Sequence, residues 1–178
     1  MTTTISGSTG VNQITDDAIT DAKLPAGSVL QVVHGNLPTT VVMSGSTSWT
    51  DVSGLLATIT PSSTTSKILI TASITLAKAG HAHARMVRGS TPVGNGTGSG
   101  SREGVFAYGN NSGGVNSTRV DSYSYLDSPS TTSATTYKIQ INNTNDSGAC
   151  YVNRTQGDTN AVYGSRGVSS ITLMEIQG

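Results

Sequence analysis

The chain has 178 residues, of which 34% are hydrophobic, 4% aromatic and 11% charged, and this length suits one domain with an extension. Ten Lys and Arg side chains balance ten Asp and Glu side chains, so the formal net charge is zero. Without a basic field, nucleic acid and membrane insertion are not expected. The low charge also argues against disorder, and the abundant Ser, Thr, Gly and Asn are typical of a β-protein with hydroxyl-rich surfaces.

The first 27 residues lack a convincing apolar period and cannot form a core of their own. Ordering their backbone costs on the order of 1–2 kcal/mol per residue, which a few scattered apolar side chains do not offset. We therefore interpret residues 1–27 as an extended N-terminal arm that becomes ordered against other chains. Its apolar side chains are expected to anchor the protein to those partners: Ile5, Val11, Ile14, Ile19 and Leu24.

From residue 28 to residue 178, short alternating runs are separated by turn residues, and no helical pattern appears. The runs read SVLQVVH, TTVVM, LLATIT, SKILITASITLAK, HAHARMVR, EGVFAYG, TRVDSYSYLD, TTYKIQI, ACYVNR and VSSITLMEI. Roughly ten short strands of this kind predict an all-β fold, an antiparallel jelly-roll-like sandwich. The glycine-rich segment 90–101 is expected to be a mobile loop between two strands.

The run from Ser66 to Lys78 is expected to organise this sandwich. Apolar residues occupy every second position in it: Ile68, Ile70, Ala72, Ile74 and Leu76. A period of two places them on one face of a strand, and the other face is small and mostly hydroxyl-bearing. A helix does not fit, because β-branched residues dominate and the apolar positions do not recur at intervals of three and four.

The closing run is apolar on both faces. Ile171 and Leu173 point one way, whereas Met174 and Ile176 point the other. A strand of this kind is covered on both faces, and in a two-layer sandwich the second cover must come from outside. We therefore predict an interface with another subunit that contains these four residues.

Several segments resemble the C-terminal region of tail-fibre and related virion proteins of tailed bacteriophages, especially marine ones. They are AKLPAGSVLQVV, ATITPSSTTSKILI, VRGSTPVGNG with SGSR after it, YLDSPSTTSATTYKIQ, YVNRTQGDTN and GVSSITLMEI. The resemblance implies a trimeric fibre or knob with a jelly roll, located in the virion after assembly in the host cytoplasm. It implies a structural or host-recognition role, as a short tail fibre or as a fibre that decorates the capsid.

Sequence signatures of enzymes are absent, so catalysis is not expected. The glycine-rich segment lacks the spacing of a dinucleotide-binding motif and the Lys-Ser/Thr of a P-loop. Gly164-Ser165-Arg166-Gly167 does not have the spacing of a nucleophile elbow. The single cysteine, Cys150, excludes an intrachain disulfide, and we expect a buried thiol. No signal peptide and no membrane-spanning stretch are expected.

The pair His81 and His83 is the one candidate for metal chemistry. Residues i and i+2 of a strand share a face, so both imidazoles point the same way. If this face lay on the axis of a trimer, three pairs would offer six nitrogens to an octahedral transition metal. The alternative is a solvated pair at the start of a strand, and no other cofactor is expected.

Aromatic side chains are the candidates for contact with a host glycan or receptor. Trp49 is expected to pack beside its neighbouring strand. Tyr123 and Tyr125 share a face with Arg119 and Asp121, which indicates a polar surface or an interface. The glycine-rich loops between residues 90 and 117 would form the recognition surface of a glycan-binding module.

Overall fold

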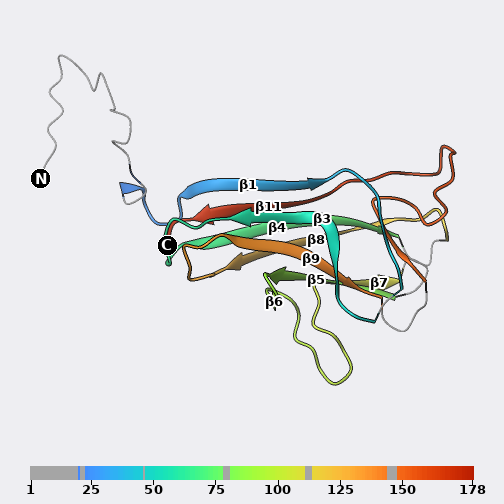
Figure 1. The fold of residues 1–178 in the computed structure, drawn as a ribbon, viewed down its shortest axis with the longest axis horizontal. Coiled ribbons are helices and arrows are strands. Elements are labelled where there is room, and N and C mark those ends of the chain that lie inside the picture. Colours follow the sequence, from blue (N-terminus) through green and yellow to red (C-terminus); the bar gives the residue numbers. More distant parts are fainter. Residues whose placement is uncertain (1–19, 21–22, 46, 78–80, 111–113, 144–147) are drawn as a thin grey trace, which may run out of the picture.

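The computed structural model describes residues 20, 23–45, 47–77, 81–110, 114–143 and 148–178. These residues form two antiparallel sheets, stacked as an elongated sandwich whose strands run along its long axis (Figure 1). The described ranges contain eleven strands: β1 (Val29–Leu37), β2 (Val41–Met43), β3 (Thr50–Ile59), β4 (Lys67–Ala77), β5 (His81–Arg88), β6 (Thr91–Pro92), β7 (Ala107–Asn110), β8 (Arg119–Asp127), β9 (Thr135–Asn142), β10 (Cys150–Val152) and β11 (Ser169–Ile176). The predicted antiparallel sandwich of roughly ten strands is confirmed.

The strand order is that of a jelly roll. In the first sheet, sheet A, β1 pairs with β11 and β11 with β4, while β8 lies on the other edge of β4. Short strands β10 and β2 extend sheet A beyond the end of β11. In the second sheet, sheet B, the order is β3, β9, β5, with β6 and β7 both pairing with β5. The chain crosses between the two sheets at several connections, such as β3 to β4, β4 to β5 and β8 to β9, so the two sheets share a common core.

Strand β4 lies at the centre of sheet A, as its alternation predicts. Ile68, Ile70 and Ile74 are fully buried between the sheets, whereas Leu69 and Thr71 on the opposite face are only partly buried. The same alternation runs through β9 and β11, which add the largest buried side chains of both sheets: Tyr137, Ile139, Ile141, Ile171 and Leu173. Packing of these two inner faces is the main source of stability in a sandwich.

Strand β3 contains an irregularity that turns one leucine outward. Its register against β9 shifts between Asp51 and Leu56, and Gly54 adopts a φ of +82°, which favours glycine. As a result Leu55 is fully buried while Leu56 is exposed on the outer face of sheet B.

Both ends of the sandwich chain meet at one end of the molecule (Figure 1). The Gly27 amide donates to the Gln177 carbonyl at 2.9 Å, and the Gln177 amide donates to the Ser28 carbonyl at 2.9 Å. The first strand begins at Val29, immediately after the expected boundary of the arm. Within the described ranges no helix has the length and apolar character needed to span a membrane.

Candidate functional site

The outer face of sheet A carries a row of apolar side chains across four strands. Val32 pairs with Met174, Met174 with Leu69, and Leu69 with Leu126. Residues directly opposite on neighbouring strands share a face, so these four side chains form one continuous stripe, called here the apolar row. Val32 is 56% exposed and Leu126 46% exposed, so the described chain leaves the ends of the row uncovered.

Hydroxyl groups continue the same face beyond the apolar row. The next row joins His34, Thr172, Thr71 and Ser124, and the imidazole Nδ1 of His34 lies 2.9 Å from the Thr172 hydroxyl. The following row joins Asn36, Ser170, Ser73 and Ser122, and its three serines line a shallow hollow. On β1, β4, β8 and β11 no carboxylate points outward, which matches the depletion of charge at the centre of protein interfaces.

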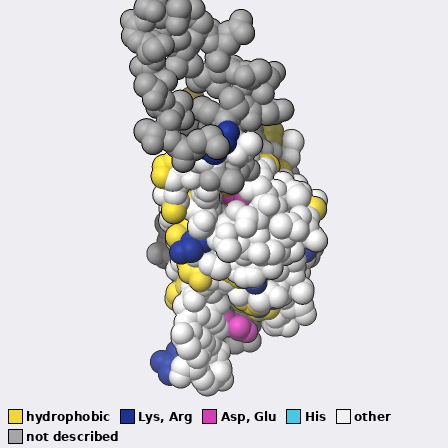
Figure 2. All heavy atoms as spheres, turned by 90° about the vertical axis from the view of Figure 1, so that its left-hand side faces the viewer, with side chains coloured by type: hydrophobic (Ala, Val, Ile, Leu, Met, Phe, Trp, Pro, Cys, Tyr) yellow, Lys and Arg dark blue, Asp and Glu magenta, His cyan; other side chains and the backbone are white. Residues whose placement is uncertain are grey.

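Figure 2 shows the end of the sandwich from which both termini leave. Neutral polar and backbone atoms dominate the described surface in this view, and charged side chains are few. Apolar side chains gather along one side of it. Charged side chains are therefore sparse at this end of the sandwich and do not create a strong electrostatic field of one sign.

The structure divides the predicted trimer-interface residues into two sets. Met174 and Ile176 point to the outer face of sheet A and are partly buried, so they are available to another chain. Ile171 and Leu173 are fully buried between the sheets, which leaves them no surface to offer. Their assignment to an interface is wrong, because the inner face of β11 is covered by the chain's own second sheet.

Of the predicted anchoring residues, only Leu24 lies in the described part of the chain. Its side chain is partly buried, one residue after Lys23, whose amide donates to the Thr20 carbonyl at 2.8 Å. Ile5, Val11, Ile14 and Ile19 lie outside the described residues.

A buried carboxylate fixes the end of β11 beside the termini. Glu175 is fully buried, and its two oxygens accept hydrogen bonds from Gln31 Nε2 at 2.6 Å and from the Ser62 amide and hydroxyl, both at 2.7 Å. Burial by itself would raise the pKa of Glu175, but the hydrogen bonds from Gln31 and Ser62 outweigh it and lower that pKa. The carboxylate therefore stays charged and joins β1, β11 and the turn after β3.

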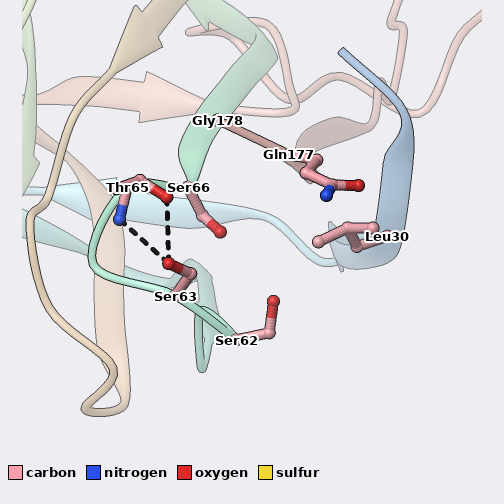
Figure 3. Close-up of a pocket in the computed structure, with 7 residues that line it drawn as sticks. All are labelled: Leu30, Ser62, Ser63, Thr65, Ser66, Gln177 and Gly178. Carbon is pink, nitrogen blue, oxygen red and sulfur yellow. Dashed lines mark hydrogen bonds between the residues drawn. The ribbon is translucent and has the colours of Figure 1, made fainter. Parts of the chain in front are cut away.

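A small cleft of about 270 Å³ lies next to this carboxylate (Figure 3). Its lining contains hydroxyls, an amide and one apolar side chain: Leu30, Ser62, Ser63, Thr65, Ser66, Gln177 and Gly178. The Ser63 hydroxyl lies 2.9 Å from that of Thr65 and accepts from the Thr65 amide at 3.2 Å. The lining side chains carry hydroxyl, amide and apolar groups and no imidazole, carboxylate or ammonium group.

No family model and no curated protein sequence matches this chain. The resemblance to phage virion proteins therefore rests on the sequence segments themselves and stays a prediction.

The outer face of sheet B differs from that of sheet A, because charged and aromatic side chains cross it. Asp51 accepts hydrogen bonds from Lys138 Nζ at 2.6 Å and Gln140 Nε2 at 2.7 Å, and Arg85 Nε donates to Gln140 Oε1 at 2.9 Å. The Arg85 guanidinium lies 4.1 Å from the centre of the Trp49 ring. Burial would raise the pKa of Asp51, but its bonds to Lys138 and Gln140 lower it. The predicted packing role of Trp49 thus takes the form of a cation–π contact.

The pair His81 and His83 lies farther along β5 on this same outer face, as predicted from the spacing. Tyr108 of β7 contacts both: its hydroxyl lies 2.9 Å from His81 Nδ1, its ring is stacked on His81 with a centroid distance of 5.6 Å, and its ring is tilted against His83 at 4.9 Å. Burial lowers the pKa of His83, so its imidazole is neutral near pH 7.

Metal binding by the two histidines stays a prediction. Among the described residues no group of three or more His, Cys, Asp or Glu side chains is arranged to hold a metal ion. Since His81 and His83 point away from the apolar row, a trimer built on sheet A would not bring three such pairs to one axis. The alternative of a solvated pair fits the exposed His81 but not His83, which is partly buried against Tyr108.

The rings of His81, His83 and Tyr108 form the floor of a cleft of about 530 Å³, called here the aromatic cleft. Its wall is formed by residues 101–105, including Arg102, Glu103 and Val105. The wall lies in the region where the sequence predicts recognition loops. The sequence does not predict the contact of Tyr108 with the two histidines, because this contact depends on the register between β5 and β7.

The loop between β6 and β7 that forms this wall is a hairpin of its own, projecting from the sandwich (Figure 1). The Gly96 amide donates to Val105 at 3.0 Å, and Ser99 and Arg102 exchange two backbone hydrogen bonds of 3.0 and 3.1 Å. The Asn95 side chain holds its base by bonding to Met86 and Val93. The glycines allow the two arms of the hairpin to approach each other closely.

Tyr123, Tyr125 and Cys150 differ in how far their burial agrees with the sequence prediction. Tyr123 is buried and donates from its hydroxyl to the Val93 carbonyl at 2.7 Å, so the expectation of a polar surface is wrong for it. Tyr125 on the same strand face is exposed. Cys150 is buried, as expected.

Proposed function

We propose that this chain is a structural and interaction protein of a tailed-bacteriophage virion. It forms a short homotrimeric tail fibre, anchored through its N-terminal arm, with the sandwich as an outward knob for host-surface recognition. The observation that carries the proposal is the apolar row on the outer face of sheet A, where Lys67 lies beside Ile176 at one end. Exposed apolar side chains aligned over four strands are the kind of surface that another protein chain covers.

The contrast between the two outer faces supports this assignment. The centre of the outer face of sheet A presents apolar and hydroxyl groups, and Lys67 is the charged side chain of β4 on this face, so burial of the centre costs little desolvation of charge. Sheet B presents Asp51, Lys138 and Arg85, which are better left in water. A trimer that buries sheet A therefore leaves sheet B and its clefts on the outside, where a receptor is met.

The position of the termini supports an arm that attaches the knob to another structure. Gly27 and Gln177 are hydrogen-bonded at one end of the sandwich, so an arm that precedes Gly27 would be attached at that end. A trimer on the capsid, as a decorating head fibre, would use the same surfaces in another place on the particle.

Two experiments test the proposal. Light scattering coupled to size-exclusion chromatography should give three times the mass of the chain at micromolar concentration, and a monomer would overturn the trimer. Immunogold electron microscopy of intact particles should then place the protein at the tail, whereas label on the capsid would favour the head fibre.

Deletion of residues 1–24 tests the arm separately. The truncated chain should fold and form trimers but should not join the particle, because its anchor is missing. Failure to fold would mean that the arm belongs to the core, and incorporation into particles would place the anchor in the knob.

A further inference from the structure

The aromatic cleft has the shape and lining of a site for a small polar ligand. Its floor consists of the adjacent rings of His81, His83 and Tyr108, and Tyr108 is 58% exposed. The register of the sheet fixes this floor, since His83 lies directly opposite Tyr108 and its neighbour Ala84 lies opposite Ala107. Rigid, exposed aromatic rings in a concave site are the usual platform for the apolar face of a ligand.

The wall of the cleft adds directional polar groups. Glu103 lies close enough to His83 and Arg85 for its charge to raise the pKa of each against the effect of burial. The Arg102 guanidinium donates to the Ser99 carbonyl at 3.2 Å, which orients it within the hairpin. The cleft thus combines an aromatic floor with one carboxylate acceptor and one guanidinium donor on its wall.

The charges at this site disfavour a cationic ligand. Glu103 contributes one negative charge, whereas Arg102 in the same wall and Arg85 on the next outward position of β5 contribute two positive charges. A ligand with an apolar face and several hydroxyls matches the floor and the wall together, whereas an organic cation would match the rings and Glu103 but would meet the two guanidiniums.

We propose that the aromatic cleft binds a saccharide unit of a bacterial surface polysaccharide, with the sugar ring on Tyr108 and its hydroxyls on Glu103 and Arg102. This rests on the proposed role in host recognition, for which it names the ligand class and the residues. Tyr108 supplies the contact area, and Glu103 selects hydroxyl donors. The hairpin of residues 96–105 sets how wide the cleft opens.

The test uses the full chain and an array of purified bacterial O-polysaccharides and capsular polysaccharides. The strongest binder is then titrated, as an oligosaccharide, into the wild type and into Tyr108→Ala, Glu103→Gln and Tyr163→Ala. Tyr163 is the matched control, because it is 56% exposed and does not line this cleft. We expect at least a tenfold loss of affinity in the first two variants and less than a twofold change in Tyr163→Ala.

Histidine NMR spectra locate the site independently of mutation. The chain has three histidines, and His34 lies on the outer face of sheet A, away from the cleft. With histidine labelled by ¹³C, the saccharide should shift the ring signals of His81 and His83 and leave those of His34 unchanged. A shift confined to His34, or equal losses in Tyr108→Ala and Tyr163→Ala, would overturn the assignment.

Other outcomes are equally decisive. Tetramethylammonium that shifts His81 and His83 without any saccharide binding would show a cation site and overturn the proposal, as would an array without a binder. Light scattering on the same samples separates this result from the proposed function: a trimer that binds no saccharide refutes only the cleft, and a monomer that binds it through Tyr108 refutes only the trimeric fibre.

Discussion

Replacing Leu126 by aspartate tests the apolar row at its exposed end. Full burial of an aliphatic side chain contributes about 1.5–3 kcal/mol, so covering the half that remains exposed contributes about 0.7–1.5 kcal/mol. The two half-exposed ends of the row, Val32 and Leu126, would together supply about 1.5–3 kcal/mol per subunit to association, and the partly buried Leu69 and Met174 would add less. Leu126→Asp removes one of these two ends and also buries a carboxylate without a partner, and we expect each subunit contact to weaken by about 2–4 kcal/mol.

That change corresponds to roughly a 30- to 1,000-fold rise in the dissociation constant of each contact, and should produce monomers at micromolar concentration. Sedimentation-velocity centrifugation measures the distribution of species directly. Leu56→Asp is the control, because Leu56 is 45% exposed, against 46% for Leu126, but lies on the outer face of sheet B. Circular dichroism should show both variants folded, since both side chains already contact water.

A trimeric Leu126→Asp variant would refute the assignment of the apolar row to the interface. If Leu56→Asp dissociates instead, the interface lies on sheet B and the aromatic cleft would face a neighbouring subunit. Dissociation of both variants would indicate a general loss of stability and not a local contact.

Three further predictions concern residues that hold the sandwich together. Glu175→Gln should lower the free energy of unfolding by about 2–4 kcal/mol at pH 7 in urea titrations. Folding lowers the pKa of Glu175 from 4.5, so its charge contributes its full stabilisation above that pH. This contribution is lost as the pH falls through the folded-state pKa. The unfolding free energies of the wild type and the variant should therefore converge in acid. Asn153→Ala should lower the free energy of unfolding by about 2–4 kcal/mol, because this buried side chain donates to the carbonyls of Leu37 and Thr39 and accepts from the Ser169 hydroxyl. Equal midpoints of urea unfolding for the wild type and the variant would contradict this prediction. Gly35→Ala should lower the melting temperature, since its methyl group would overlap the Leu56 carbonyl oxygen, and an unchanged temperature would show that β1 can shift freely.

Alternation predicted the fold because the central strands have one buried face each. The pattern of β4 identified its core residues, and that of β11 identified two apolar faces correctly. Alternation does not say which face meets the second sheet, and this is why Ile171 and Leu173 were assigned to an interface that only Met174 and Ile176 can reach.

The buried polar groups could not be found from sequence, because their partners are distant. Glu175 in an otherwise apolar run had no visible reason to be buried, and Gln31 and Ser62 lie more than a hundred residues away. Asn153 begins an Asn-x-Thr triplet, yet its side chain is fully buried in hydrogen bonds. Asp127 likewise accepts from Arg88 and Tyr137 only after β5, β8 and β9 have come together.

The sequence predicts only part of the aromatic cleft. The spacing of His81 and His83 placed both on one face, but Tyr108 follows them by 25 residues and reaches them through the pairing of β5 with β7. The glycine-rich loop was expected to be mobile, whereas Gly96, Ser99 and Arg102 form a regular hairpin. Its glycines are needed for the close approach of the two arms, a purpose that composition alone does not distinguish from flexibility.

The meeting of both chain ends at one end of the sandwich has a mechanical consequence. A pull on the arm enters the knob at Val29 and runs along β1, whose residues from Gln31 to Leu37 are paired in unbroken register with β11. A force along the strand axis loads these hydrogen bonds together in shear, and they do not open one after another as in unzipping. Strand β11 is itself paired along its other edge to β4, so the tension spreads into the centre of sheet A. A knob attached in this way would withstand drag on a moving particle better than one held through an edge hairpin.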